Sequence, residues 1–101
     1  MKEISKQNAK KLGSQTMLFQ TQEECAELIK AIGKYNRTNG IGQKTETTKE
    51  EAFTNLLEEL ADVSICIEQL IYLLDIETEI EELKDKAFRK VKHRYEQKNS
   101  Y

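Results

Sequence analysis

Residues 48–74 read TKEEAFTNLLEELADVSICIEQLIYLL, the longest stretch of this chain with apolar residues at helical spacing. Thr48 and Glu51 stand three positions apart at its beginning, as in the capping box that starts many helices. The apolar residues then recur every three or four positions, which predicts one long α-helix. These apolar residues are Phe53, Leu56, Leu57, Leu60, Val63, Ile67, Leu70, Ile71 and Leu74.

The same helical spacing is found on both sides of this stretch. It predicts one helix over about 16–37, another that follows a break at about 75–78 and ends at about 97, and a short one over 2–12. Glycine, asparagine and threonine are frequent in residues 36–48, where no periodicity is present, so this segment is expected to be a loop. Because every periodic segment is helical, the expected fold class is all-α, with the helices packed as an antiparallel bundle.

The length of 101 residues predicts a single domain spanning 1–101. A domain of this size buries only about two thirds of the surface that its unfolded chain exposes. The long predicted helix also carries a second apolar stripe, formed by Ala61, Ile65 and Tyr72. A helix that is apolar on two sides needs two partners, and the second is either another subunit or the N-terminal helix. We therefore expect oligomerisation to complete the bundle.

Composition and charge exclude several classes of protein. The chain has 16 basic and 18 acidic residues, a balance that does not favour nucleic-acid binding by the surface as a whole. Its polar N-terminus is unlike a signal peptide, and no apolar stretch reaches the roughly 18 residues of a membrane span. Cys25 and Cys66 lack metal-site spacing and are expected to be buried, reduced thiols. These features predict a soluble cytoplasmic protein.

An acidic motif occurs twice in the chain. Residues 23–28 read EECAEL and residues 58–63 read EELADV, 35 positions later. In the first copy, Glu24 and Glu27 border the apolar stripe of their helix. In the second copy, Glu59 and Asp62 border theirs in the same way. If the two stripes pack together, both carboxylate pairs meet at the edge of one core.

Four carboxylates in a partly dehydrated cleft repel one another strongly unless protons or cations intervene. Oxygen ligands alone favour Mg²⁺, with Mn²⁺ or Ca²⁺ as substitutes. A di-iron centre is not expected, because it needs two Glu-x-x-His pairs and the only histidine, His93, is far from both motifs. Exposed acidic residues are most often a solvated helix face, so that interpretation stays open beside metal binding.

EECAELIKAI at 23–32, NLLEELADV at 55–63 and the basic C-terminal segment resemble the MazG-like nucleotide pyrophosphohydrolases of the all-α nucleoside triphosphate pyrophosphatase superfamily. The lead-in KKLGSQTMLFQTQEECAEL at 10–28 extends the resemblance to nearly the whole chain. The resemblance implies a dimeric or tetrameric helical bundle that hydrolyses nucleoside or deoxynucleoside triphosphates to the monophosphate and pyrophosphate. Mg²⁺ would be the cofactor, and the role would be control of deoxynucleotide pools or nucleotide house-cleaning.

The resemblance also implies which residues act. The residues at the family's metal-ligand positions, and hence the expected catalytic residues, are Glu24, Glu27, Glu59 and Asp62. Basic side chains of the last helix contact the phosphates in this superfamily, and the candidates, spaced every four residues, are Lys86, Lys90 and Arg94. These three are equally compatible with ordinary surface cations.

Other functions remain open at this level. One alternative is the same reaction on phosphoribosyl-ATP, dUTP or a damaged nucleotide. Residues 36–47 or a neighbouring subunit would then recognise the base. A non-catalytic helical interaction module is another, since seven basic residues lie between Lys84 and Lys98. No glycine-rich phosphate loop and no recognisable nucleophile motif is present, so a P-loop or covalent mechanism is not expected.

Overall fold

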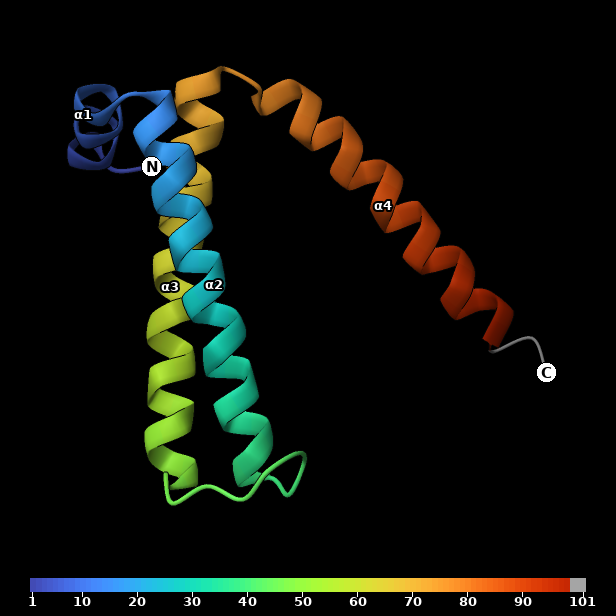
Figure 1. Ribbon diagram of the computed structural model, residues 1–101. Coiled ribbons are helices and arrows are strands. Elements are labelled where there is room, and N and C mark those ends of the chain that lie inside the picture. The colour runs from blue at the N-terminus through green and yellow to red at the C-terminus, as the bar shows by residue number, and fades with distance from the viewer. Residues whose placement is uncertain (99–101) are drawn as a thin grey trace.

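The computed structural model describes residues 1–98, and the last three residues of the predicted 1–101 domain lie outside the described residues. Four α-helices, connected by short segments and one longer loop, make up this part of the chain (Figure 1). Their bounds are α1 Glu3–Leu12, α2 Ser14–Thr38, α3 Lys49–Leu74 and α4 Glu77–Lys98. The predicted all-α class is confirmed for residues 1–98, where no strand is present.

Both ends of α3 are fixed by local hydrogen bonds. The Thr48 hydroxyl accepts a hydrogen bond from the backbone N–H of Glu51 at 3.2 Å, as expected for a residue that caps a helix N-terminus. At the other end Asp75 adopts the left-handed conformation, with φ of 55° and ψ of 48°. The next residue, Ile76, donates its N–H to the carbonyl of Ile71 at 3.2 Å, which closes the last turn.

Gly13 separates α1 from α2 and allows a sharp change of direction between them. Its φ of 84° with ψ of 164° is a conformation that residues with a Cβ rarely adopt. Its N–H donates to the carbonyl of Ala9, and its own carbonyl accepts from the N–H of Met17, both at 3.0 Å. As a result α1 lies across the ends of α2 and α3 where those two helices are farthest from their connecting loop (Figure 1).

The helices α2 and α3 lie side by side and run in opposite directions, because a single loop over 39–48 joins them at one end (Figure 1). Near this loop the rings of Tyr35 and Phe53 pack with centroids 5.6 Å apart. At the opposite end, the buried Gln69 donates from Nε2 to the backbone oxygen of Ser5 at 3.0 Å and ties α1 to α3. The buried apolar residues are Ala9, Met17, Ala31, Ala52, Val63 and Cys66.

The last helix, α4, leaves this assembly and contacts only α3 among the described helices (Figure 1). All of its residues except Ile80 are exposed, including Phe88 and Tyr95, each at 68%. The radius of gyration is 17.5 Å, compared with about 13 Å for a compact domain of 100 residues. The single chain therefore leaves much apolar surface without a partner. No helix in residues 1–98 combines the length and apolar character needed to cross a bilayer.

Candidate metal centre

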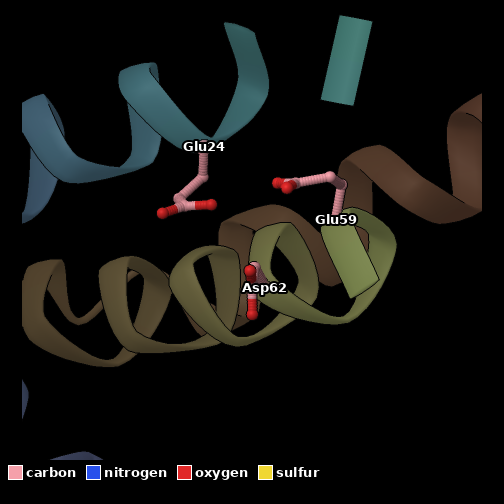
Figure 2. A group of neighbouring side chains, drawn as sticks. All are labelled: Glu24, Glu59 and Asp62. Atoms are coloured by element: carbon pink, nitrogen blue, oxygen red, sulfur yellow. The ribbon is translucent and has the colours of Figure 1, made fainter. Parts of the chain in front are cut away.

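Three carboxylates from the two acidic motifs meet between α2 and α3. Glu24 comes from α2, and Glu59 and Asp62 come from successive turns of α3. Each offers one carboxylate oxygen, and these three oxygens lie within 4.8 Å of one another. Figure 2 shows Glu24 extending from α2 toward α3, Glu59 extending into the same space, and Asp62 beside them on α3. The helix periodicity explains the pair on α3, because residues three apart share a face.

Glu59 has the most perturbed environment in this cluster. Removal from water raises its pKa most, and the negative charges of Glu24 and Asp62, followed by those of Glu27 and Glu58, raise the pKa further. Its Oε2 atom is buried and receives no hydrogen bond from any described residue. A proton or a cation would compensate a carboxylate oxygen that lies out of contact with water beside like charges.

The donor set fits a hard divalent cation. The three converging ligand atoms are all carboxylate oxygens, which Mg²⁺, Mn²⁺ and Ca²⁺ prefer over nitrogen or sulfur. A second observation also favours a bound cation. The Oε2 atom of Glu59 receives no hydrogen bond from the described residues, and a cation would compensate its charge. Acidic groups on helices often gather without an ion, and here Asp62 is exposed and Glu24 and Glu59 are half-buried, with the Oε2 atom of Glu59 out of contact with water.

Glu27, the fourth predicted ligand, lies to one side of the three converging oxygens. It is one turn beyond Glu24 on α2, and its Oε1 is 3.4 Å from Nζ of Lys30, in an exposed ion pair. Its charge still contributes to the raised pKa of Glu59, so the side chain is near the cluster. The structure therefore brings together three of the four predicted carboxylates and places Glu27 at their edge.

The predicted phosphate ligands on α4 are not brought to this cluster within one chain. Lys86, Lys90 and Arg94 are exposed, and α4 points away from the α2–α3 pair (Figure 1). The charges that act on Glu59 are all negative. A single chain therefore gathers three of the predicted carboxylates and does not bring the predicted basic residues to them.

A cavity of about 260 Å³ adjoins the carboxylates. Glu24 and Asp62 form part of its wall, together with amide side chains that the sequence patterns did not single out. No periodicity or motif marks these amides, since they come from three different helices and meet only in the folded chain. The full lining is Asn8, Gln20, Glu24, Asp62, Ile65, Cys66 and Gln69.

The two cysteines are free, and they lie close to the cluster. Cys66 is buried as predicted, and Cys25 is half-buried. Burial raises the pKa of the Cys66 thiol, and the negative charges of Glu24 and Asp62 raise that pKa further. A thiol with a raised pKa is a poor nucleophile, which agrees with a structural role for Cys66.

Comparison of this chain with protein-family models, with curated proteins and with solved structures finds no match.

Proposed function

We propose that this chain is a Mg²⁺-dependent nucleoside triphosphate pyrophosphohydrolase of the MazG-like kind. It cleaves nucleoside or deoxynucleoside triphosphates to the monophosphate and pyrophosphate, in the cytoplasm, in deoxynucleotide pool control or nucleotide house-cleaning. The observation that carries the proposal is the convergence of Glu24, Glu59 and Asp62 from two matched motifs, around a buried Glu59 oxygen without a hydrogen-bond donor. The resemblance of the two motifs to that family supplies the reaction.

The carboxylates bind the metal ion in this reaction. Glu24, Glu59 and Asp62 hold the cation, and Glu27 joins them from the neighbouring turn of α2. Mg²⁺, or Mn²⁺ in its place, supplies charge neutralisation for the triphosphate and lowers the pKa of a water. The helices α2 and α3 hold the ligand oxygens in fixed positions, and phosphoryl-transfer enzymes depend mainly on such positioning and charge neutralisation.

A second copy of the chain completes the bundle in this proposal, giving a homodimer or homotetramer. Three observations support this: the radius of gyration of 17.5 Å, the exposed helix α4, and an exposed apolar row on it formed by Leu83, Val91 and Tyr95. A triphosphate also needs cations that one chain does not bring to the carboxylates. In the oligomer, Lys86, Lys90 and Arg94 of α4 from a second copy bind the phosphates.

Sedimentation velocity tests the oligomer directly. The wild type is expected to sediment as a dimer or tetramer at micromolar concentration, and Phe88→Glu, which places a charge on the exposed face of α4, is expected to shift it toward the monomer. The matched control is Arg89→Glu, at the neighbouring exposed position, and it should leave the assembly unchanged. A wild type that stays monomeric at every concentration contradicts the proposed assembly.

The reaction itself is tested with a panel of nucleotides. The protein is incubated with each nucleoside and deoxynucleoside triphosphate, including dUTP, and with phosphoribosyl-ATP, in Mg²⁺ and in EDTA, and the products are separated by chromatography. Glu59→Gln is run in parallel, with Glu58→Gln as the matched control on the adjacent residue. Monophosphate and pyrophosphate should appear only with Mg²⁺, in the wild type and in Glu58→Gln. Orthophosphate as the product, or no turnover of any nucleotide, contradicts the proposal.

The exposure of α4 favours one alternative, a non-catalytic helical interaction module. Its basic residues and its apolar face are both accessible, as a partner-binding helix requires. In that case the carboxylates are only a solvated face, and Mg²⁺ should stabilise the fold no more than an equal ionic strength of NaCl does. Specific stabilisation by Mg²⁺ together with nucleotide turnover excludes the module as the whole explanation.

A further inference from the structure

Lysines gather on α1, the helix that lies across the end of the α2–α3 pair (Figure 1). Residues 2–12 contain four lysines and one acidic residue, Glu3. Two of the lysines, Lys6 and Lys10, stand about one helical turn apart and share a face of α1. Neither forms an ion pair with any residue in 1–98. These two positive charges therefore have no directly bonded carboxylate in the described part of the chain.

Both lysines converge on one aromatic ring of α3. The Nζ atom of Lys6 lies 5.5 Å from the centroid of the Tyr72 ring, and the Nζ atom of Lys10 lies 5.8 Å from the same centroid. The face of the ring attracts each ammonium group. Like charges one turn apart on a helix repel each other. Tyr72 thus holds two cations at one place, where a shared anion would relieve their repulsion.

The hydroxyl of Tyr72 adds a third hydrogen-bonding group. Hydrogen bonding with Tyr72 is the largest cause of the raised pKa of Lys10, which is therefore a cation at neutral pH. An ammonium group can only donate, so the Tyr72 oxygen accepts and its own O–H remains available to another acceptor. Lys6 and Tyr72 are half-buried and Lys10 is exposed, so the group is accessible from solvent.

We propose that Lys6, Lys10 and Tyr72 form a binding site for a phosphate monoester, which we call the Tyr72 site. Near neutral pH such a group carries about 1.5 to 2 negative charges and three strong acceptor oxygens. Two ammonium groups and one phenolic O–H match it in both charge and number of donors. A carboxylate would bring only one negative charge. The bound phosphate bridges α1 and α3, and its binding does not depend on the proposed hydrolysis.

The Tyr72 site is separate from the candidate metal centre. Asp62 and Tyr72 are ten residues apart on α3, which is about 15 Å at 1.5 Å per residue. The acidic residue whose charge acts on Lys10 is Glu3, on α1 itself. A phosphate at the Tyr72 site is therefore a second ligand, distinct from a substrate held at the carboxylates.

Isothermal titration calorimetry of the full chain in EDTA tests the site, because without a metal ion the carboxylates cannot recruit phosphate. The probes are inorganic phosphate and phenyl phosphate, at neutral pH and constant ionic strength. The wild type should bind both. Lys6→Gln and Lys10→Gln should each weaken binding roughly 10-fold, through loss of one charge-assisted hydrogen bond. Lys10→Arg should retain binding, and Tyr72→Phe, which keeps the ring and removes the hydroxyl, should weaken it.

The matched control is Lys11→Gln. It removes the same charge from the exposed neighbour of Lys10, whose ammonium group is not over the Tyr72 ring in the described chain, and it should leave phosphate binding unchanged. Vesicles of phosphatidylcholine, with and without phosphatidic acid, distinguish a lipid headgroup from a free phosphate. These vesicles are tested for binding with the same set of variants.

The outcomes separate the two sources and the failure of the proposal. Binding of the free phosphates that Lys6→Gln and Lys10→Gln weaken and Lys11→Gln retains supports a soluble ligand. The same pattern with phosphatidic acid vesicles alone supports a lipid headgroup at the same site. Binding of neither probe, or an equal loss in Lys11→Gln, overturns the proposal, since the second result means attraction by net charge alone.

Discussion

The substitution Glu59→Gln should change the stability of this protein in opposite directions with and without Mg²⁺. It removes one negative charge from the three carboxylates and nearly preserves the size of the side chain. The carboxylate oxygens lie within 4.8 Å of one another, closer than the screening distance of about 8 Å at physiological ionic strength, so their charges repel. Because the variant relieves this repulsion, it should melt at a higher temperature than the wild type in EDTA. With Mg²⁺ the order should reverse, because the variant has lost a ligand.

The expected stabilisation by Mg²⁺ can be calculated for one ion bound per cluster. At a Mg²⁺ concentration a hundredfold above the dissociation constant, one site that exists only in the folded state adds about 2.7 kcal/mol to the free energy of unfolding. For a chain of 101 residues, about 4–8 °C of melting temperature per kcal/mol gives an increase of roughly 11–22 °C. The wild type should show this increase, and Glu59→Gln should show little of it.

Thermal unfolding followed by circular dichroism, at one fixed protein concentration and neutral pH, measures both effects. Glu58→Gln is the control, because it removes the same charge from the adjacent exposed residue outside the three converging oxygens. The reasoning is refuted if Glu59→Gln retains the full Mg²⁺ increment. It is refuted equally if Glu58→Gln loses the increment to the same extent, since the effect would then be general charge screening.

Three other predictions concern the pH dependence and the folding of the chain. The folded state raises the pKa of Glu59, so in the metal-free protein the contribution of Glu59 to stability is greatest below the ordinary glutamate pKa and is lost as pH rises through the raised value. The difference in melting temperature in EDTA between the wild type and Glu59→Gln should therefore change over this pH range. Met17→Ala empties a fully buried site and should cost about 2–5 kcal/mol in urea unfolding, whereas Leu18→Ala, at an exposed neighbour, should cost far less. Thr48→Ala removes the acceptor for the N–H of Glu51 and should cost about 1 kcal/mol by the same assay, with no change in Mg²⁺ binding.

The helices and the converging carboxylates of the candidate site could be predicted from the sequence, because both depend on local spacing. Periodicity placed α3 within one residue of its observed bounds, and the capping role of Thr48 follows from side-chain chemistry alone. The convergence of Glu24 with Glu59 and Asp62 was predictable for a related reason. Residues that border the apolar stripes of two antiparallel neighbours must meet at the edge of their shared core.

The rest of the site depends on how the helices are placed relative to one another. The conformation of Gly13 sets α1 across the end of the α2–α3 pair, and only this placement brings Asn8 near Glu24. The side chain of Glu27 shares the motif of Glu24, yet it pairs with Lys30 at the outer edge of the cluster.

The direction of α4 could not be predicted from the sequence either. Its apolar stripe predicted packing, but a stripe specifies only that a partner is needed and not which surface provides it. In the folded chain α4 points away from the α2–α3 pair, and its basic residues do not reach the carboxylates (Figure 1). Local spacing thus determined which faces are apolar, acidic or basic. The turn conformations and crossing geometry, which depend on contacts between residues far apart in sequence, determined which of these faces meet.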